Sequence, residues 1–273
     1  MRRAENSLLL VLVLPLIAVV TAFLLLPLAQ LVLIGASGEQ GWSSYILILG
    51  NPRYLNSIVT TVALSTSVTA VTLILSTISG VFLIRNSFWG KRFITTLLAL
   101  PLAFPGVVIG FMVIMLAGRL GIISSITLAL FGERIVFAYS LAGLFAGYVY
   151  FSIPRTILTI MAAAEKLDVR LEEAARSLGA SSWDVVRDVI VPTLKPALVA
   201  GGAICFATAM GAIGTVYTLG TRIDVLPLTI YVEFVVQANL IAASALSFVL
   251  GLITWSVLTV ARAATGSTVA AAG

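Results

Sequence analysis

Six long apolar stretches dominate this sequence and leave few folds open to it. A helix needs about 20 mostly apolar residues to cross a lipid bilayer. The chain is 60% hydrophobic and only 10% charged, whereas soluble domains carry about 25% charged residues. The apolar stretches cover roughly residues 8–34, 57–84, 93–117, 136–160, 197–217 and 240–261. We therefore predict an all-α, polytopic membrane protein with about six transmembrane helices.

The 16 lysine and arginine residues are distributed unevenly between the predicted helices. If the N-terminus is inside, the inner segments hold Arg2, Arg3, Arg85, Lys91, Arg92, Arg155, Lys166, Arg170, Arg176, Arg187, Lys195 and Arg262. The outer segments then hold only Arg53, Arg119, Arg134 and Arg222. Short cytoplasmic loops are enriched in Lys and Arg, so this bias predicts that both termini are cytoplasmic. A net charge of +5 would also suit a nucleic-acid partner, but its distribution favours a membrane, and we expect no nucleic acid.

The residue inventory excludes several kinds of site within this chain. The sequence has no histidine and one cysteine, Cys205. An internal disulfide, a Cys/His metal site and a Ser–His–Asp triad therefore lack their components. The sequence also has no Gly-x-x-x-x-Gly-Lys-Ser/Thr phosphate loop. We expect no catalytic residue, no metal ligand and no cofactor held by this chain, and we expect Cys205 to be a small buried side chain.

The segment 161–196 differs from the short connections elsewhere in the chain. It is polar, is predicted to be mostly cytoplasmic, and holds six of the 11 acidic residues. Leucines recur at helical spacing between Leu167 and Leu178, and Gly179 can end that helix. Ser181 and Asp184 match the capping pattern that begins another helix. We predict two short amphipathic helices that bind a protein partner, with the lipid surface as the alternative that their mixed charge disfavours.

One pattern in this segment is specific. Glu173-Ala174-Ala175 is followed by three residues, Gly179, nine residues and Val189-Ile190-Val191-Pro192. It resembles the signature of the binding-protein-dependent ABC importer permeases, which is Glu-Ala-Ala, three residues, Gly, nine residues and Ile-x-Leu-Pro. The spacing agrees at every position, and the two departures, Val189 and Val191, exchange one apolar side chain for another. The carboxylate of Glu173 can accept a charge-assisted hydrogen bond from a cationic partner.

The resemblance implies a single transmembrane permease domain over 1–273 with a MetI-like core. That core would cover about 55–268, with an additional N-terminal helix at 8–34 and the cytoplasmic coupling helices at 163–196. Residues 98–110 are also similar to a proline-containing helix of the family. The residues implied to contact the ATPase are Glu173, Ala174, Ala175, Gly179, Val189, Val191 and Pro192.

The resemblance also implies a function and a set of partners. The chain would be a multi-pass protein of a bacterial inner membrane that forms the translocation path for a small solute. Two ABC ATPase subunits would bind the ATP and magnesium and supply the energy. A second permease chain, different rather than identical, would complete the path through the lipid bilayer. An extracytoplasmic binding protein would deliver the solute.

The fifth predicted helix is rich in small and polar residues, and the family uses that helix in its translocation path. The resemblance therefore implies a pore lining, whereas close packing between helices would favour the same residue types. The candidate path residues are Thr208, Gly211, Gly214, Thr215, Tyr217 and Thr218. Two glycine pairs with the spacing of packing motifs, Gly106 with Gly110 and Gly143 with Gly147, are expected to allow close helix packing.

Charged residues are nearly absent from the middle of the predicted spans. We place Arg155 near the cytoplasmic end of the fourth span, as an anchor that reaches toward the membrane surface. On the outer side, Pro227 can start a short helix from Leu228 to Gln237. The charged residues of that outer segment, Arg222, Asp224 and Glu233, are expected to face water or a partner.

The alternative function is that of a secondary, ion-coupled transporter. Such a protein requires features such as inverted repeats, broken helices or intramembrane carboxylates, and the sequence has no charged coupling pair. Gly211-Ala212-Ile213-Gly214 lacks the acidic residue found there in many permeases for oxyanions or ferric ion. The stretch from Thr218 to Tyr231 is more similar to the branch that serves polyamines, iron and phosphonates.

Overall fold

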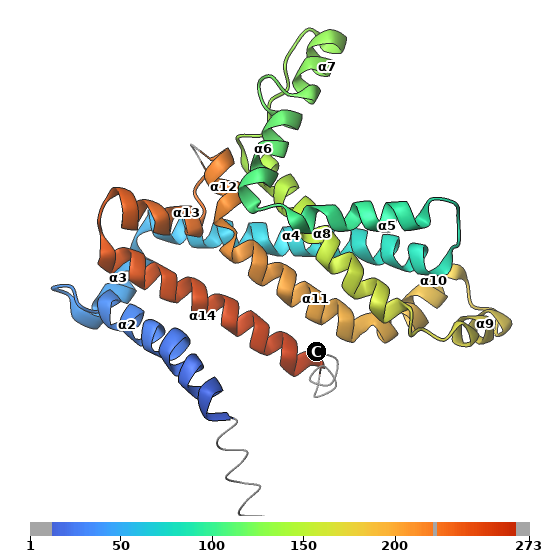
Figure 1. Cartoon of the computed structure of the whole chain (residues 1–273), viewed down its shortest axis with the longest axis horizontal. Coiled ribbons are helices and arrows are strands. Elements are labelled where there is room, and N and C mark those ends of the chain that lie inside the picture. The colour runs from blue at the N-terminus through green and yellow to red at the C-terminus, as the bar shows by residue number, and fades with distance from the viewer. Residues whose placement is uncertain (1–12, 221–222, 266–273) are drawn as a thin grey trace, which may run out of the picture. The chain divides into compact units, whose positions relative to one another are not determined.

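The computed structural model describes residues 13–220 and 223–265, and every regular element within them is a helix (Figure 1). The elements before the third span are η1 (Thr21–Leu25), α2 (Leu26–Gly35), η2 (Gly41–Ser43), α3 (Ser44–Gly50), α4 (Pro52–Arg85), α5 (Lys91–Ala99) and η3 (Leu100–Ala103). The next are α6 (Gly106–Ala117), α7 (Ile122–Phe131), α8 (Leu141–Ala164), α9 (Val169–Ser177), α10 (Ser182–Val185) and η4 (Val186–Ile190). The last are α11 (Val191–Gly211), α12 (Ile213–Leu219), α13 (Leu226–Tyr231), η5 (Val232–Val236) and α14 (Leu240–Thr265).

Six helical segments of the described chain are long and apolar enough to cross a membrane. They are Val13–Gly35, Pro52–Arg85, Gly106–Phe131, Leu141–Ala164, Ser182–Gly211 and Leu240–Ala264. The prediction of an all-α protein with six membrane helices is therefore confirmed. The side of the membrane on which the termini lie stays a prediction from the charge bias.

The predicted continuous helix over 93–117 is wrong. After α5, the chain forms the 3₁₀ turn η3, and then Phe104 and Pro105 are extended, with ψ angles of 132° and 152°. A proline lacks the N–H that a helix interior needs and disfavours helical conformation in the preceding residue. Pro101 and Pro105 therefore interrupt the apolar run, and the third candidate span begins only at Gly106.

The predicted second amphipathic helix is not a separate element. α10 continues through the π turn η4 into α11, so Pro192 is the second residue of α11 rather than the end of a helix. A π turn shifts the hydrogen-bond register by one residue, which accommodates a residue that lacks an N–H. The fifth membrane helix, predicted to continue to residue 217, ends at Gly211. Ala212 (φ −75°, ψ 95°) separates it from α12.

The described residues form two compact units. The first combines the described part of 1–58 with 229–252, and in it Tyr45 of α3 contacts both α2 and α14. The Tyr45 hydroxyl donates a hydrogen bond to the carbonyl of Val32 (2.9 Å), and its ring meets that of Phe248 edge-on at 5.8 Å. Gly35 makes room for this tyrosine, since a Cβ there would lie 2.5 Å from the Tyr45 hydroxyl oxygen.

The short helix predicted near Pro227 is confirmed, but one of its residues differs from the prediction. α13 and η5 begin two residues earlier than expected, with Pro227 as the second residue. Glu233 is completely buried instead of facing water, and its carboxylate lies 3.6 Å from Arg53 and accepts a hydrogen bond from Asn239 at 3.3 Å. A nearby cation and hydrogen-bond donors offset the loss of water around a carboxylate. Asp224 is exposed, while Arg222 lies outside the described residues.

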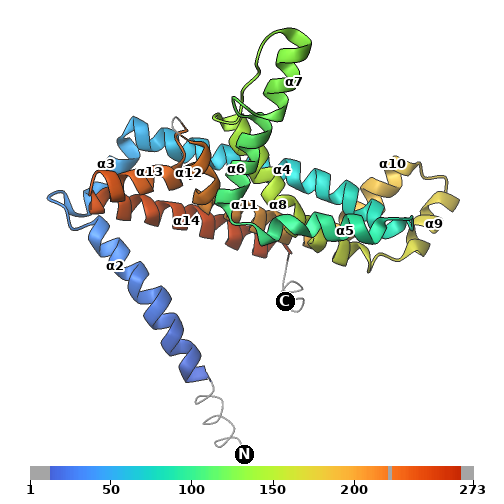
Figure 2. The same cartoon turned by 45° about the horizontal axis from the view of Figure 1, so that its top comes forward.

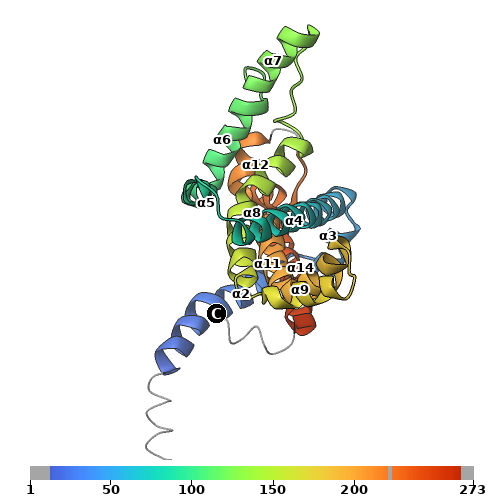
Figure 3. The ribbon, with the colours of Figure 1, turned by 90° about the vertical axis from the view of Figure 1, so that its right-hand side faces the viewer.

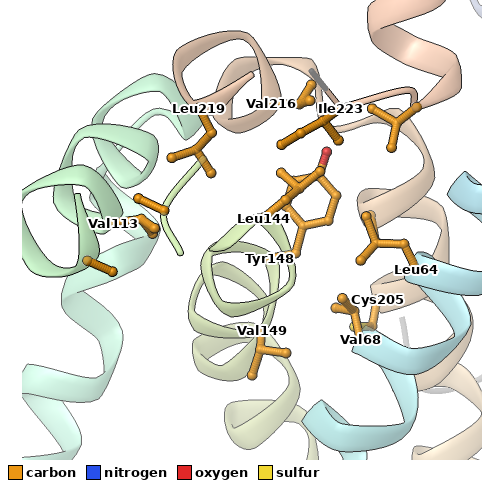
Figure 4. Close-up of a cluster of buried hydrophobic side chains, with 14 residues drawn as sticks. Leu64, Val68, Val113, Leu144, Tyr148, Val149, Cys205, Val216, Leu219 and Ile223 are labelled. Carbon is orange, nitrogen blue, oxygen red and sulfur yellow. The ribbon is translucent and has the colours of Figure 1, made fainter. Parts of the chain in front are cut away.

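The second unit, residues 59–228 with the described part of 253–273, has a core where α4, α6, α8, α11 and α12 meet. Figure 4 shows Leu64 and Val68 facing Tyr148 and Cys205 in this cluster. Cys205 is 3% exposed, which confirms the prediction of a small buried side chain.

Glycines allow α6 to lie close against α12 (Figure 3). A Cβ at Gly106 would lie 3.2 Å from the hydroxyl of Thr215, and one at Gly110 would lie 2.6 Å from the Cβ of Thr218. A Cβ at Gly147 of α8 would lie 3.1 Å from the Thr215 methyl group. The packing role of these three glycines is confirmed, whereas Gly143 faces the backbone carbonyl of Ala138 instead of another helix.

Candidate functional site

The predicted coupling segment packs against the ends of α4 and α8 (Figure 2). Apolar side chains from both ends of the segment form a small cluster with side chains of these two helices. Its buried members are Ile160, Ala164, Leu167, Val185, Ile190 and Leu194, with Val81 and Ile84 of α4 packed against them. The cluster therefore joins α10, η4 and α11 to α4 and α8 through side-chain contacts.

Local sequence signals set the shape of the segment. The Asp168 carboxylate caps α9 by accepting from the backbone N–H of Arg170 (2.9 Å). Gly179 has a φ of +89°, which glycine adopts at little cost after a helix ends. The side chains of Ser181 and Asp184 cap α10 reciprocally. The predicted turn and the predicted capping box are both confirmed.

An ion pair that sequence reasoning missed anchors α9. Arg85, the last residue of α4, donates from its guanidinium to the carboxylate of Glu172. Both side chains are largely buried, at 22% and 11% exposed. Glu172 precedes Glu173 in the chain, and the spacing pattern alone did not tell which of the two faces inward.

The opposite face of the segment is exposed. Glu173 and Ala174 both face outward, and the Glu173 carboxylate forms no ion pair within the described residues. The same segment exposes two large apolar side chains, Leu178 at 90% and Trp183 at 69%. Exposed large apolar side chains are common at interaction surfaces. Of the other motif residues, Ala175 and Val189 are half-buried, and Gly179, Val191 and Pro192 are exposed.

The structure divides the candidate path residues into two groups. Thr215 and Thr218 pack against α6, where their hydroxyls donate to the carbonyls of Gly106 (3.0 Å) and Val107 (3.3 Å). Gly214 lies in the same contact, since a Cβ there would come 3.0 Å from the backbone nitrogen of Val107. The second group is Thr208, Gly211 and Tyr217, which are partly or fully exposed. Lining of the path stays a prediction for all six.

Arg155 lies beside the second group. Its Nη1 donates a hydrogen bond to the Thr208 hydroxyl (3.1 Å) between α8 and α11. The break at Ala212 lies one helical turn beyond Thr208, and the hydroxyl of Tyr148 donates to the Ala212 carbonyl there.

Solved structures of known proteins resemble this fold. The chain is similar to a chain of a bacterial alginate ABC transporter in complex with a periplasmic protein that carries an alginate pentasaccharide. The TM-score is 0.81 at 17% sequence identity, and the match covers 96% of both chains. A second structure of a bacterial ABC transporter for alginate import matches with a TM-score of 0.77.

Relatives with assigned roles are permeases. A probable sulfate transport system permease protein of Chlorella vulgaris is 31% identical over 79% of this chain and 81% of its own length. The molybdenum transport system permease protein of Escherichia coli (strain K12) is 34% identical over 59% of this chain and 72% of its own. A putative 2-aminoethylphosphonate transport system permease protein of Salmonella typhimurium is 28% identical over 93% of this chain and 92% of its own.

The family model described as "binding-protein-dependent transport system inner membrane component" matches residues 72–266. This range includes the anchored coupling segment, the α6–α12 contact and the break at Ala212. The comparisons lend no support to a secondary transporter. The chain belongs to this family and is a multi-pass inner-membrane permease subunit of an ABC importer.

Proposed function

We propose that the coupling segment 163–196 binds an ABC ATPase subunit and passes its movement to the membrane helices. The observation that carries this proposal is the two-sided construction of α9. One side is anchored by Arg85 and Glu172, while the other exposes Glu173, in a segment that also exposes Leu178 and Trp183. An unpaired carboxylate next to apolar surface suits a cleft that offers a cationic side chain and apolar contacts.

The energy comes from partner chains. The sequence has no phosphate-binding loop of its own, so we assign ATP and magnesium to a dimer of ATPase subunits and no catalytic step to this chain. A second permease subunit, different from this chain, completes the translocation path. A solute-binding protein delivers the solute from the other side of the membrane, in agreement with the description of the family.

The cargo we propose is a small solute that carries a negatively charged group. The relatives named for a defined compound transport sulfate and 2-aminoethylphosphonate, which both carry an acidic oxyanion. The solute passes over the exposed candidates Thr208, Gly211 and Tyr217, while Gly214, Thr215 and Thr218 hold α12 against α6.

The coupling role is tested by Glu173→Arg in the full chain co-expressed with its partner subunits. We expect the ATPase to be lost from the purified complex or ATP-driven uptake to be abolished, because a cation would replace the carboxylate that the partner recognises. Glu133→Arg is the matched control, since Glu133 is equally exposed but lies far from the segment in the sequence. Normal uptake by Glu173→Arg with its ATPase bound would contradict the coupling role.

The energy source is tested separately in proteoliposomes. We expect uptake to require ATP and to continue when the proton gradient is collapsed at constant ATP. Loss of uptake on collapse of the gradient alone would instead favour ion coupling.

A further inference from the structure

Arg155 is a charged residue inside a membrane span. It is the fifteenth residue of α8 (Leu141–Ala164), with nine residues between it and the end of the helix. At 1.5 Å per residue, this places its Cα about 13 Å from the Ala164 end. Charged residues at such depth are costly, and they mark functional sites unless they reach the membrane surface. The direction of the side chain therefore decides its role.

The side chain points away from the nearer end of α8. Thr156 and Thr159 lie level with Gly201, since a Cβ at Gly201 would be 3.8 Å from both methyl groups. The Arg155 guanidinium instead reaches Thr208, seven residues further along α11. Cβ atoms tilt toward the N-terminus of their helix, which here is the predicted outer end. The guanidinium therefore extends into the span, and the expected reach toward the cytoplasmic surface is wrong.

Much of the hydrogen-bonding capacity of Arg155 is unused within the described chain. Thr208 accepts one N–H of the guanidinium and donates its own hydroxyl to the carbonyl of Ile204 (2.8 Å). The residue is exposed and forms no ion pair with the described residues. A guanidinium has five N–H donors arranged as a fork that matches the oxygens of a carboxylate, sulfate or phosphonate. The hydrogen bond to Thr208 thus orients the Arg155 guanidinium and leaves most of the guanidinium N–H donors available.

The neighbouring surface is unsuited to contact with lipid chains. Ile204, Thr208 and Gly211 are exposed or partly exposed at positions i, i+4 and i+7 of one face of α11. That face ends at the break at Ala212. Irregular backbone at membrane depth is tolerated only where it is buried in protein or lines a water-filled cavity. An ionised arginine is likewise excluded from a surface in contact with lipid chains.

We propose that Arg155, oriented by Thr208, forms an anion-binding step in the translocation path. The ligand is the oxyanion group of the transported solute, which the free N–H groups of Arg155 bind as it passes. This inference deepens the proposed function and depends on the chain lining a path. It assigns to Arg155 the selection of solutes that carry a negative charge. The coupling segment does not have this role.

Charged thiol reagents test the proposal without knowledge of the solute. Thr208→Cys is introduced into Cys205→Ser, which removes the one native cysteine, and the assembled transporter is purified. We measure its reaction with an anionic (sulfonatoethyl) and a cationic (trimethylammonioethyl) methanethiosulfonate. We expect Arg155 to raise the ratio of anionic to cationic reaction rates about tenfold over that in Arg155→Gln, because a local charge concentrates counter-ions. Arg155→Lys should keep most of this preference.

Gln40→Cys, at an exposed position outside the coupling segment, is the matched control, and its rate ratio should not respond to Arg155→Gln. A thiol at 208 that stays unreactive in the assembled transporter, or an unchanged ratio, would overturn the proposal. Loss of the second permease subunit from the Arg155→Gln complex would also overturn it, because Arg155 would then pair with a carboxylate of that subunit.

Uptake gives a second readout. Proteoliposomes with the complete transporter are offered sulfate and 2-aminoethylphosphonate, with putrescine as the cationic comparison. We expect uptake of at least one of the two anions, reduced about tenfold by Arg155→Gln and unchanged by Arg92→Gln, which removes an exposed arginine of α5. Uptake of putrescine alone would refute the anion site yet leave the importer intact, whereas loss of ATP dependence would refute the proposed function itself.

Discussion

Two adjacent glutamates in α9 have opposite environments. Successive residues of a helix point about 100° apart, so Glu172 turns inward to Arg85 while Glu173 faces outward. The inner carboxylate holds α9 to α4, and the outer one forms no ion pair within the described residues. The proposed contact residue therefore lies next to an anchor that the sequence pattern does not include.

At the residue scale, we predict that Glu172→Gln loosens the coupling segment. The guanidinium of Arg85 would lose its ionised partner in a largely buried site, at a cost of about 1–3 kcal/mol in the free energy of unfolding. The purified complex should melt at a lower temperature, and solute uptake should fall while ATP hydrolysis continues. Arg187→Gln is the control, because its 3.7 Å pair with Asp188 is exposed and such pairs contribute about 0–1 kcal/mol. Equal effects of the two substitutions would argue against an anchoring role.

At the scale of elements, the membrane helices are interrupted at defined places. Pro105 separates η3 from α6, the π turn η4 precedes Pro192, and Ala212 separates α11 from α12. Prolines explain the first two irregularities, because they remove backbone donors. The third has no proline, and there the hydroxyl of Tyr148 donates to the carbonyl of Ala212.

We predict that Tyr148→Phe destabilises the break between α11 and α12. Tyr148 is 3% exposed, so the substitution removes a buried hydrogen bond to the Ala212 carbonyl, at a cost of about 1 kcal/mol. Thermal melting of the purified complex measures the loss. Tyr139→Phe should have little effect, since Tyr139 is 40% exposed. A melting temperature unchanged by Tyr148→Phe would mean that the break does not need this hydrogen bond.

At the scale of the whole molecule, the topology remains open to a direct test. The charge bias predicts that Gln40 lies outside the membrane and Ser182 lies in the cytoplasm. In intact cells, a membrane-impermeant thiol reagent should label Gln40→Cys but not Ser182→Cys, both made in Cys205→Ser. Inside-out vesicles should give the reverse pattern, and the opposite result in both preparations would invert the topology.

Features that depend on neighbouring residues could be predicted from the sequence. Apolar length identified six spans, and the spacing from Glu173 to Pro192 identified the family. The turn at Gly179 and the cap at Ser181 were predicted because capping involves residues a few positions apart. The helix over 93–117 was predicted wrongly because apolar composition was given more weight than Pro101 and Pro105.

Which face of each helix meets another helix could be learned only from the tertiary structure. Arg85 and Glu172 are 87 positions apart, Tyr148 and Ala212 are 64 apart, and Arg155 and Thr208 are 53 apart. In an almost uniformly apolar helix, hydrophobic periodicity does not show which side meets protein and which meets lipid. The direction of a long side chain such as Arg155 depends on the partner that packing brings within reach. Contacts between distant helices therefore determined which residues anchor the segment 163–196 and which hold α12 in place.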